Sequence, residues 1–217
     1  MEKHLYMNLE SVRNEYKYSI LTKKSVDKNP FKQFEKWLNE ALHSELKEPT
    51  AMALNTIGLD EFPQSRIVLL KSFDEQGFVF FTNYKSAKGN SIDKRPEVGL
   101  HFFWPELERQ IRISGITEKT SAKVSDNYFH SRPLNSQISA IISDQSSEIP
   151  SREFLEKRFK KLSSTIKNQP PKRPVWWGGY LVKPVKIEFW QGRENRLHDR
   201  ILYKKQNESW IIKRLAP

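Results

Sequence analysis

The chain has 217 residues and a formal net charge of +11, and it contains no cysteine. The lack of cysteine excludes disulfides, thiolate metal sites and a cysteine nucleophile, and the absence of any long apolar run leads us to expect a soluble cytoplasmic protein. The charge favours anionic partners: nucleic acid, an acidic surface or phosphorylated small molecules.

Residues 1–28 are polar and carry no periodic pattern, so we expect a flexible segment ahead of a single domain at 29–217. Asn29 followed by Pro30 predicts a helix start, because asparagine caps helices and proline suits the first helical position. The apolar residues that follow recur at steps of three and four, which predicts a helix ending by Pro49.

Residues 66–71, Arg-Ile-Val-Leu-Leu-Lys, predict a central strand buried on both faces, because its aliphatic run is uninterrupted. Side chains alternate along a strand, so Arg66 and Lys71 are expected to point to opposite faces. Buried cations need partners, so these two either reach out to solvent at the strand ends, pair with acidic neighbours, or each meet an anionic ligand. A glycine-containing turn at 74–77 predicts a hairpin between this strand and residues 78–82.

The rest of the chain predicts further strands around a helical section. Ser86 can cap a short helix with Lys88 in its first turn, where backbone N–H groups favour an anion. Two longer helices are expected at 121–131 and 151–168. The remaining strands are expected at 51–57, 98–104, 109–116, 179–183, 185–191, 200–203 and 210–215. Strands in two batches around a helical insert indicate an α+β fold, with an antiparallel sheet or barrel and helices to one side.

The common nucleotide-binding and catalytic signatures are absent: the chain has no G-x-G-x-x-G, Walker loop, H-E-x-x-H or G-x-S-x-G. No metal site is expected. Its 8 glycines are too scattered to form a phosphate loop from backbone alone, so side chains must hold any phosphate. Residues 190–200 concentrate arginines with a histidine and a tryptophan. If this segment is extended, Arg196 and His198 share a face, as do His198 and Arg200. A charge-laced turn with a purely structural role is the alternative.

Several stretches resemble the pyridoxine/pyridoxamine 5′-phosphate oxidase family, whose members use FMN to make pyridoxal 5′-phosphate. The matching stretches occur in one order from about residue 30 to the C-terminus, with a further cluster at 13–16. They are RIVLLK (66–71), FTN (81–83), LERQ (107–110), YFHSRP (128–133), SQI (136–138), QSS (145–147), WWGG (176–179), IEFWQG (187–192), RLHDR (196–200) and RLAP (214–217).

The resemblance implies an FMN-binding split β-barrel and a homodimer with FMN at the subunit interface. It implies oxidation of pyridoxamine or pyridoxine 5′-phosphate to pyridoxal 5′-phosphate, with O2 as the final acceptor and H2O2 as a product. The positions that match FMN contacts are Arg66, Ile67, Val68, Leu69, Leu70, Lys71, Phe81, Thr82, Lys88, Gln110, Gln145, Ser146, Trp190 and Arg200. Those that match substrate contacts are Arg13, Asn14, Glu15, Tyr16, Lys71, Tyr128, Arg132, Ser136, Arg196, Leu197 and His198.

Within the substrate set, the resemblance assigns Lys71, Tyr128, Arg132 and Ser136 to the substrate phosphate. It places Arg196 and His198 over the pyridine ring, and these two are the candidate catalytic residues. Residues 13–16 match a segment that closes on the substrate.

One departure from the family pattern is Ala87, which stands where a basic residue commonly precedes Lys88, and this predicts weaker binding of the FMN phosphate. The absence of a dinucleotide fingerprint favours FMN over FAD. Two alternatives remain: an FMN-binding split barrel that acts on another substrate, and a basic nucleic-acid-binding β protein with exposed aromatic residues. For the oxidase, no nucleic-acid or membrane partner is expected.

Overall fold

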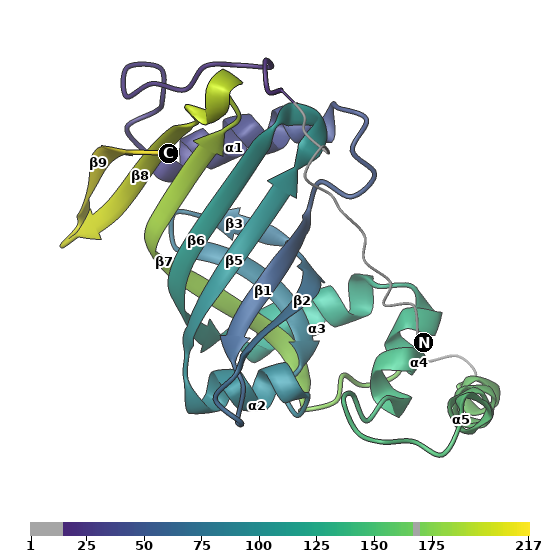
Figure 1. The fold of residues 1–217 in the computed structure, drawn as a ribbon. Coiled ribbons are helices and arrows are strands. Elements are labelled where there is room, and N and C mark those ends of the chain that lie inside the picture. The colour runs from purple at the N-terminus through teal and green to yellow at the C-terminus, as the bar shows by residue number, and fades with distance from the viewer. Residues whose placement is uncertain (1–14, 167–169) are drawn as a thin grey trace, which may run out of the picture.

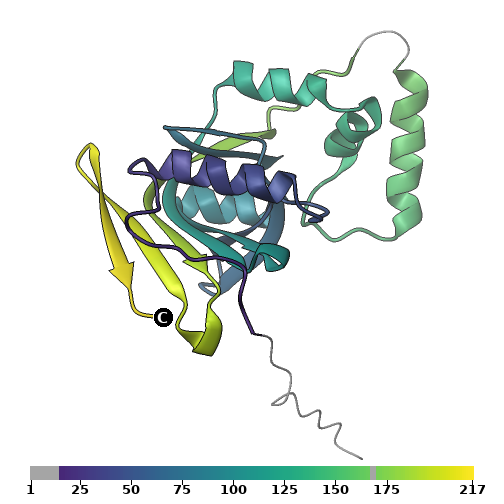
Figure 2. The ribbon, with the colours of Figure 1, turned by 90° about the horizontal axis from the view of Figure 1, so that it is seen from above.

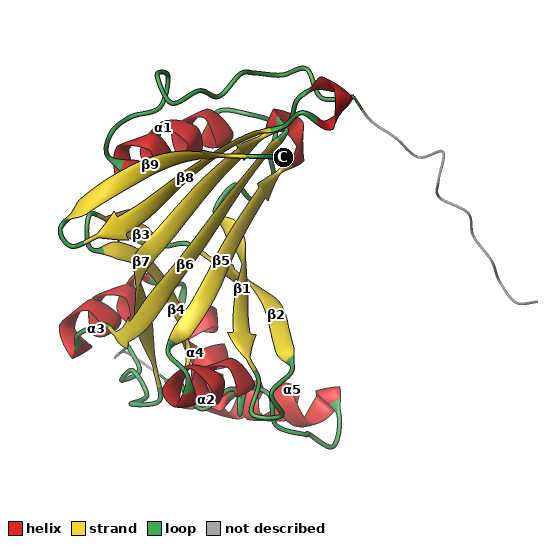
Figure 3. Ribbon diagram, turned by 60° about the vertical axis from the view of Figure 1, so that its left-hand side comes forward, coloured by secondary structure: helices red, strands yellow, loops and turns green. Residues whose placement is uncertain are grey.

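A computed structural model describes residues 15–166 and 170–217, which form an α+β fold (Figures 1 and 3). The strands are β1 (Ala51–Ile57), β2 (Pro63–Leu69), β3 (Ser72–Asp74), β4 (Gly77–Asn83), β5 (Glu97–Trp104), β6 (Arg109–Lys119), β7 (Trp177–Gln191), β8 (Asp199–Gln206) and β9 (Ser209–Leu215). The helices are α1 (Pro30–Leu42), α2 (Ala87–Lys94), α3 (Ala122–Ser131), α4 (Leu134–Ile142) and α5 (Arg152–Thr165), with 3₁₀ turns η1 (Pro105–Leu107) and η2 (Glu194–Arg196). No helix in the described residues is long and apolar enough to cross a membrane.

The strands form one curled antiparallel sheet in the order β2-β1-β5-β6-β7-β4-β3, with β8 paired to β7 and β9 to β8 (Figure 3). β6 runs along one edge of β7 for nearly its whole length. On the other edge, residues 177–182 of β7 pair with β4, and residues 186–191 pair with β8. The predicted α+β fold, with an antiparallel sheet and flanking helices, is confirmed.

β7 is a single strand, whereas the sequence predicts two strands interrupted at Pro184. The interruption is a β-bulge, because Ser114 pairs with Lys186 while Gly115 pairs with Pro184. Proline is tolerated at a bulge, where its missing N–H costs no ladder hydrogen bond, and a bulge bends the strand that carries it. Gly115 suits the close approach here, since a Cβ at this position would lie 2.7 Å from the carbonyl oxygen of Lys183.

Helix α1 closes one end of the curled sheet (Figure 2). As predicted, Asn29 caps it by accepting a hydrogen bond from the Phe31 N–H, and Pro30 is its first residue. The helix ends at Leu42, one turn earlier than the apolar pattern predicts. Its fully buried Phe34 meets the edges or faces of three rings from the sheet, Phe73, Phe78 and Phe102. Aromatic burial of this kind holds the curled sheet around a single core.

The predicted central strand at 66–71 is corrected in three respects. β2 lies at the edge of the sheet and pairs only with β1, rather than forming a hairpin with β4; the short β3 pairs with β4 instead. It is not buried on both faces, since Ile67 is 66% exposed. Lys71 follows the strand, which ends at Leu69. A short aliphatic run fits a central strand and an edge strand equally well, and only the pairing distinguishes them.

Helices α3, α4 and α5 project to one side of the sheet (Figures 1 and 2). The sequence predicts α3 and α5, although α5 ends at Thr165 and the predicted end at 168 lies outside the described residues. It does not predict α4, whose serines favour turns as readily as helix. α4 nevertheless contributes side chains to the main cavity.

Candidate functional site

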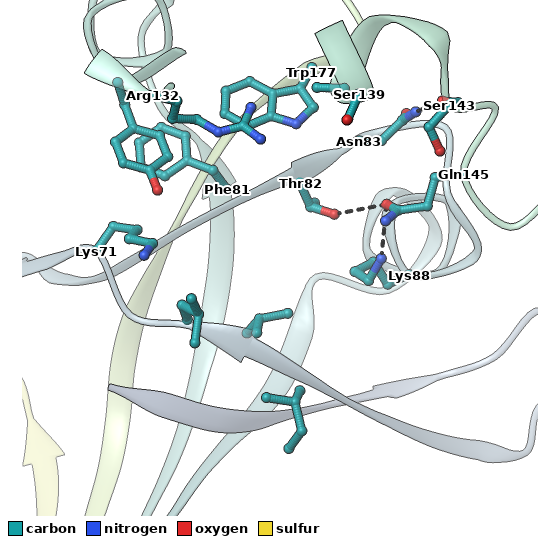
Figure 4. A pocket seen from close by; sticks show the side chains of 15 residues that line it. Lys71, Phe81, Thr82, Asn83, Lys88, Arg132, Ser139, Ser143, Gln145 and Trp177 are labelled. Atoms are coloured by element: carbon teal, nitrogen blue, oxygen red, sulfur yellow. Dashed lines mark hydrogen bonds between the residues drawn. The ribbon is translucent and has the colours of Figure 1, made fainter. Parts of the chain in front are cut away.

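A cavity of about 520 Å3 lies between β2, β4 and the helices α2, α3 and α4 (Figure 4). We call it the anion cavity. Its lining residues are Ile67, Val68, Leu69, Lys71, Phe81, Thr82, Asn83, Lys88, Tyr128, Arg132, Ser139, Ala140, Ser143, Gln145 and Trp177. The cavity is therefore the place where helices α3 and α4 meet β2, β4 and the start of α2.

The anion cavity contains the cations Lys71, Lys88 and Arg132, which reach it from three different parts of the fold (Figure 4). Within the described ranges, none of the three forms an ion pair with a carboxylate. Lys88 and Arg132 are partly buried, whereas Lys71 is exposed. Partly buried cations that lack a counter-charge are unfavourable, so Lys88 and Arg132 call for an anionic ligand.

Lys88 is the most perturbed of these cations. Burial, and then the positive charge of Arg66, lower its pKa to about 8. Its Nζ donates to Gln145 Oε1 at 3.1 Å and to Ser86 Oγ at 3.3 Å (Figure 4). Gln145 Oε1 also accepts from the hydroxyl of Thr82 at 3.3 Å. These neutral partners orient the ammonium group without cancelling its charge.

The start of α2 places Lys88 beside free backbone N–H groups. Ser86 caps the helix by accepting from the Gly89 N–H, as predicted. Gly89 allows the helix to begin close to Tyr84, because a Cβ there would lie 2.0 Å from the carbonyl oxygen of Tyr84. Helix N-termini favour anions, so the backbone N–H groups of α2 and the ammonium group of Lys88 would both attract an anion.

Arg132 enters the cavity from the end of α3. Its Nη2 donates to the carbonyl oxygen of Ser136 at 2.9 Å, and its guanidinium lies 4.7 Å from the ring centre of Trp177. Its Nη1 is buried and has no hydrogen-bond partner in the described part of the chain. Burial lowers the pKa of Arg132. An unpaired buried N–H group is costly, and an anion that draws the guanidinium toward the cavity would satisfy it.

Aromatic rings form one wall of the anion cavity. Phe81 and Tyr128 are stacked with their ring centres 3.9 Å apart, and Trp177 lies nearly parallel to both. The cavity thus combines a flat apolar wall with cations. Such a set suits ligands that carry both a ring and a phosphate.

A second group of predicted site residues lies at the turn between β7 and β8. We call Tyr16, Trp190, Arg196 and His198 the Trp190 cluster. Their rings are in contact, since the centre of the His198 ring lies 4.7 Å from Trp190 and 5.6 Å from Tyr16. The edge of Tyr16 meets Trp190 at 5.8 Å.

The turn between β7 and β8 is not extended, which corrects the expectation that Arg196 and His198 share a face of a strand. Asn195 and Arg196 have φ values of 56° and 60°, in the left-handed region, around the 3₁₀ turn η2. His198 Nδ1 accepts a hydrogen bond at 3.1 Å from the backbone N–H of Arg193, so in the neutral ring the proton is on Nε2. Burial, and then the charge of Arg196, lower the pKa of His198.

Sheet register brings three further predicted residues together beside this turn. Gln110 on β6 is paired with Trp190 on β7, which is paired in turn with Arg200 on β8. Arg200 donates to both carboxylate oxygens of Glu188, at 2.8 Å and 3.2 Å. The side chain of Gln110 contacts His101 at 3.1 Å.

The anion cavity and the Trp190 cluster are far apart in one protomer. Trp177 and Trp190 stand at opposite ends of the 15-residue strand β7, so about 40 Å of strand separates them. Figure 1 shows the same separation, with the helical section at one end of β7 and the turn to β8 at the other. Within one chain, the two groups therefore do not form a single site.

The remaining predicted residues lie elsewhere. Arg66 is outside the lining and donates to Thr56 Oγ1 at 2.7 Å and to the backbone of β1. Leu70 is buried in the core. Leu197 is 67% exposed, and Glu15 pairs with Lys17. Neither Ser136 nor Ser146 lines the cavity. Arg13 and Asn14 lie outside the described residues.

Sequence reasoning assigned no role to several lining residues: Asn83, Ser139, Ala140, Ser143 and Trp177. Asn83 and Trp177 belong to matching stretches, so a signal for them was present. The others lie on or directly after α4, and they could not be placed without that helix. Among the described residues, no group of three or more histidine, cysteine or acidic side chains is arranged to hold a metal ion.

Two family models match the chain. The pyridoxamine 5′-phosphate oxidase model matches residues 38–165, and the model of the pyridoxine 5′-phosphate oxidase C-terminal dimerisation region matches residues 177–217. Proteins named pyridoxine/pyridoxamine 5′-phosphate oxidase from Flavobacterium johnsoniae and Aliarcobacter butzleri are each 51% identical to the chain. The alignments cover 96% and 97% of this chain, and 99% and 100% of those proteins.

Solved structures share the fold. The crystal structure of PhzG from Burkholderia lata 383, in complex with tetrahydrophenazine-1-carboxylic acid, superposes with a TM-score of 0.84 at 27% identity, covering 91% of this chain and 98% of that one. A pyridoxamine 5′-phosphate oxidase-related, FMN binding protein from Nostoc punctiforme gives a TM-score of 0.70 at 17% identity, covering 85% and 97%. The second likeness concerns the fold alone.

Proposed function

Because the chain belongs to the pyridoxine/pyridoxamine 5′-phosphate oxidase family, we propose that it oxidises pyridoxamine or pyridoxine 5′-phosphate to pyridoxal 5′-phosphate, with FMN as its cofactor. O2 is the final electron acceptor and H2O2 a product. The curled sheet is the split β-barrel of this family. The observation that carries the proposal is the anion cavity, in which unpaired cations surround an aromatic wall.

The residues of the anion cavity fit two phosphorylated ligands. Lys88, with the N-terminus of α2, would hold the FMN phosphate, while Thr82 and Gln145 would line the cofactor. Among the described residues, the buried Nη1 of Arg132 has no partner, and we assign Arg132 to the substrate phosphate together with Lys71 and Tyr128. Side chains take the place of a glycine loop at both sites.

We infer that the working enzyme is a homodimer with FMN at the subunit interface. The match of residues 177–217 to a dimerisation region supports a homodimer. The separation of the anion cavity from the Trp190 cluster supports the finer arrangement, because a second copy can bring its Trp190 cluster to the cavity of the first. Gln110 and Arg200 would then contact the cofactor from the partner's side.

FMN, when bound, supplies the hydride acceptor and returns its electrons to O2. The protein positions the substrate against it and excludes water. His198 would donate a hydrogen bond from Nε2 to the substrate, because its Nδ1 is occupied by the Arg193 N–H. Arg196 adds a positive charge at the same turn. Tyr16, which belongs to the segment expected to close on the substrate, lies against His198. Leu21 and Val26 are buried in the core, so they belong to the domain rather than to a flexible segment at 1–28.

A direct test is to purify the protein, release any bound flavin with acid and identify it by chromatography, and then assay H2O2 production with pyridoxamine 5′-phosphate. We expect a yellow protein that yields FMN and turns over this substrate. Recovery of FAD would overturn the cofactor assignment. Bound FMN without turnover of either phosphate ester would favour a split-barrel flavoprotein with another substrate, and a flavin-free protein would favour the nucleic-acid-binding alternative. The cytoplasmic location stays a prediction.

A further inference from the structure

Arg132 is held in the anion cavity without a carboxylate. Its guanidinium lies over the ring of Trp177 at 4.7 Å, and its Nη2 donates to the carbonyl oxygen of Ser136 at 2.9 Å. Trp177 is itself buried, with 7% of its surface exposed. Within the described residues, Arg132 Nη1 is buried and unpaired. These contacts hold the guanidinium in place and leave its charge without a counter-charge and its Nη1 without a partner.

The neighbouring Arg173 shows the more usual way to hold a buried arginine. Its Nε pairs with Asp126 Oδ1 at 2.6 Å, and its Nη1 donates to the carbonyl oxygen of Trp177 at 2.5 Å. A carboxylate partner neutralises the cation and occupies its N–H groups. An aromatic face attracts the cation through the ring quadrupole and takes none of its N–H groups. Arg132 thus keeps both its charge and a free donor.

Trp177 is well suited to act as a fixed support. Its backbone N–H donates to the carbonyl oxygen of Pro174 at 3.0 Å, and its carbonyl is held by Arg173. It is the first residue of β7 and is paired with Asn83 on β4. The sheet therefore fixes the backbone of Trp177, and its ring packs against Phe81 and Phe129, with centres 5.7 Å and 5.3 Å away. Arg132 is thus stacked against a supported surface.

We propose that Trp177 is a positioning residue for the substrate phosphate. It holds the guanidinium of Arg132 charged and oriented beside the cavity. Arg132 contacts the phosphate, and Trp177 acts through Arg132. This inference rests on the proposed function, which places the substrate phosphate at Arg132.

The adjacent Trp176 provides a matched control. It also lies beneath a cation, since Lys85 Nζ is 5.2 Å from its ring centre. However, neither Trp176 nor Lys85 lines the anion cavity. Two neighbouring tryptophans with similar cation contacts therefore differ in whether the cation reaches the cavity.

The experiment compares Trp177→Leu, Trp177→Phe and Trp176→Leu in the FMN-loaded enzyme, with thermal melting to confirm folding. We expect Trp177→Leu to raise KM for pyridoxamine 5′-phosphate about 10-fold while kcat changes little, because the phosphate is unchanged by the reaction. Trp177→Phe keeps a smaller aromatic face and should raise KM less. Trp176→Leu should leave both constants unchanged. Should Trp177→Leu not fold, an unchanged KM in Trp177→Phe would overturn the proposal, and a raised KM there would support it.

A double-mutant cycle separates this role from a general effect on the cavity. In an Arg132→Ala background, Trp177→Leu should no longer lower kcat/KM, because the residue through which it acts is gone. An equal loss of kcat/KM in both backgrounds would overturn the inference.

A binding measurement keeps this inference distinguishable from the proposed function. Titration of the FMN-loaded protein with inorganic phosphate should show weaker binding in Trp177→Leu than in wild type, whatever the true substrate is. If wild-type protein binds phosphate but does not turn over pyridoxamine 5′-phosphate, only the proposed function is contradicted. If wild type and Trp177→Leu bind phosphate with equal affinity, the role of Trp177 is contradicted.

Discussion

The anion cavity and the Trp190 cluster are built in opposite ways. The cavity takes its cations from the end of a strand, the first turn of a helix and the end of another helix, and within the described chain these cations have no carboxylate partners. The Trp190 cluster lies at a turn whose residues Asn195 and Arg196 have left-handed backbone conformations. Its neighbour Arg200 is paired with Glu188.

This contrast indicates that the anion cavity serves binding and that the Trp190 cluster serves the chemical step. Lys88 lies in α2, while Lys71 and Arg132 lie directly beside β3 and α3. Positions anchored by regular elements suit ligand phosphates that do not change during the reaction. Sparsely populated backbone conformations are costly and tend to occur at functional sites, where they aim particular side chains. Interactions with an unchanging group lower KM, whereas interactions at the reacting atoms raise kcat. We therefore expect mutations in the two regions to affect different kinetic constants.

The largest effect is expected in the Trp190 cluster. Arg196→Ala and His198→Ala should retain FMN but slow reduction of the flavin by about 10- to 1,000-fold at saturating substrate, since both side chains are proposed to lie at the reacting carbon. Anaerobic stopped-flow reduction by pyridoxamine 5′-phosphate measures this step alone. Glu194→Gln, an exposed change in the same turn, is the control. Wild-type reduction rates in both alanine variants would make Arg196 and His198 binding residues only.

Mixed dimers test whether the two regions meet across the subunit interface. Lys71→Ala damages the cavity and His198→Ala damages the cluster, so each homodimer is impaired at both of its sites. In a mixed dimer with shared sites, one site carries both defects and the other carries none. Co-expression with separate purification tags should therefore restore about half of the wild-type activity per mixed dimer. If the mixed dimers are no more active than the parent homodimers, the anion cavity and the Trp190 cluster do not meet across the subunit interface.

Lys71→Ala should act on binding. We expect KM for pyridoxamine 5′-phosphate to rise by about 10- to 100-fold, the range for loss of one charge-assisted hydrogen bond, with a smaller fall in kcat. Steady-state kinetics of the FMN-loaded enzyme measure both constants. Lys85→Ala removes a nearby lysine that does not line the cavity and is the control. A fall in kcat without a change in KM would contradict the division between the two regions.

The binding of FMN to the apoprotein should depend on pH through Lys88. The pKa of Lys88 is lowered to about 8, so above pH 8 the free protein loses this charge and must regain a proton to bind the phosphate. FMN affinity should thus be greatest below pH 8 and fall by up to about 10-fold per pH unit above it. Titration of FMN with the apoprotein, followed by flavin fluorescence at a series of pH values from about 6.5 to about 9.5, measures this dependence. Lys88→Arg should remove the dependence; the same slope in that variant would assign it to another group.

The smallest effect is expected at Ala87. This residue is exposed at the first position of α2, beside Lys88. Ala87→Arg should tighten FMN binding by about 1 kcal/mol, because a new charge-assisted contact to phosphate would be partly screened by water. Ala122→Arg makes the same change at the first position of α3, which is outside the cavity lining, and should have no effect. Equal or weaker FMN binding in Ala87→Arg would mean that another residue already fills this role.

Local features of this protein are readable from its sequence. Asn29 and Pro30 start α1, Ser86 caps α2, and the hairpin of β5 and β6 occurs where the pattern predicts it. Each depends on neighbours within a few residues, through capping, proline geometry or alternation of side chains. The motifs that identify the family and many lining residues of the cavity are likewise short stretches. The sequence alone therefore determined most of the elements, the family and the kind of ligand.

Tertiary structure decided how those pieces combine. The aliphatic run at 66–71 forms an edge strand because β2 pairs only with the preceding strand β1, while the short β3 takes the pairing with β4. Pro184 does not end β7, since a bulge opposite Gly115 accommodates it. Gln110, Trp190 and Arg200 become neighbours only through register across three strands, while β7 separates them from the cavity at its other end. Pairing and register depend on contacts between distant segments, which no local pattern of residues encodes.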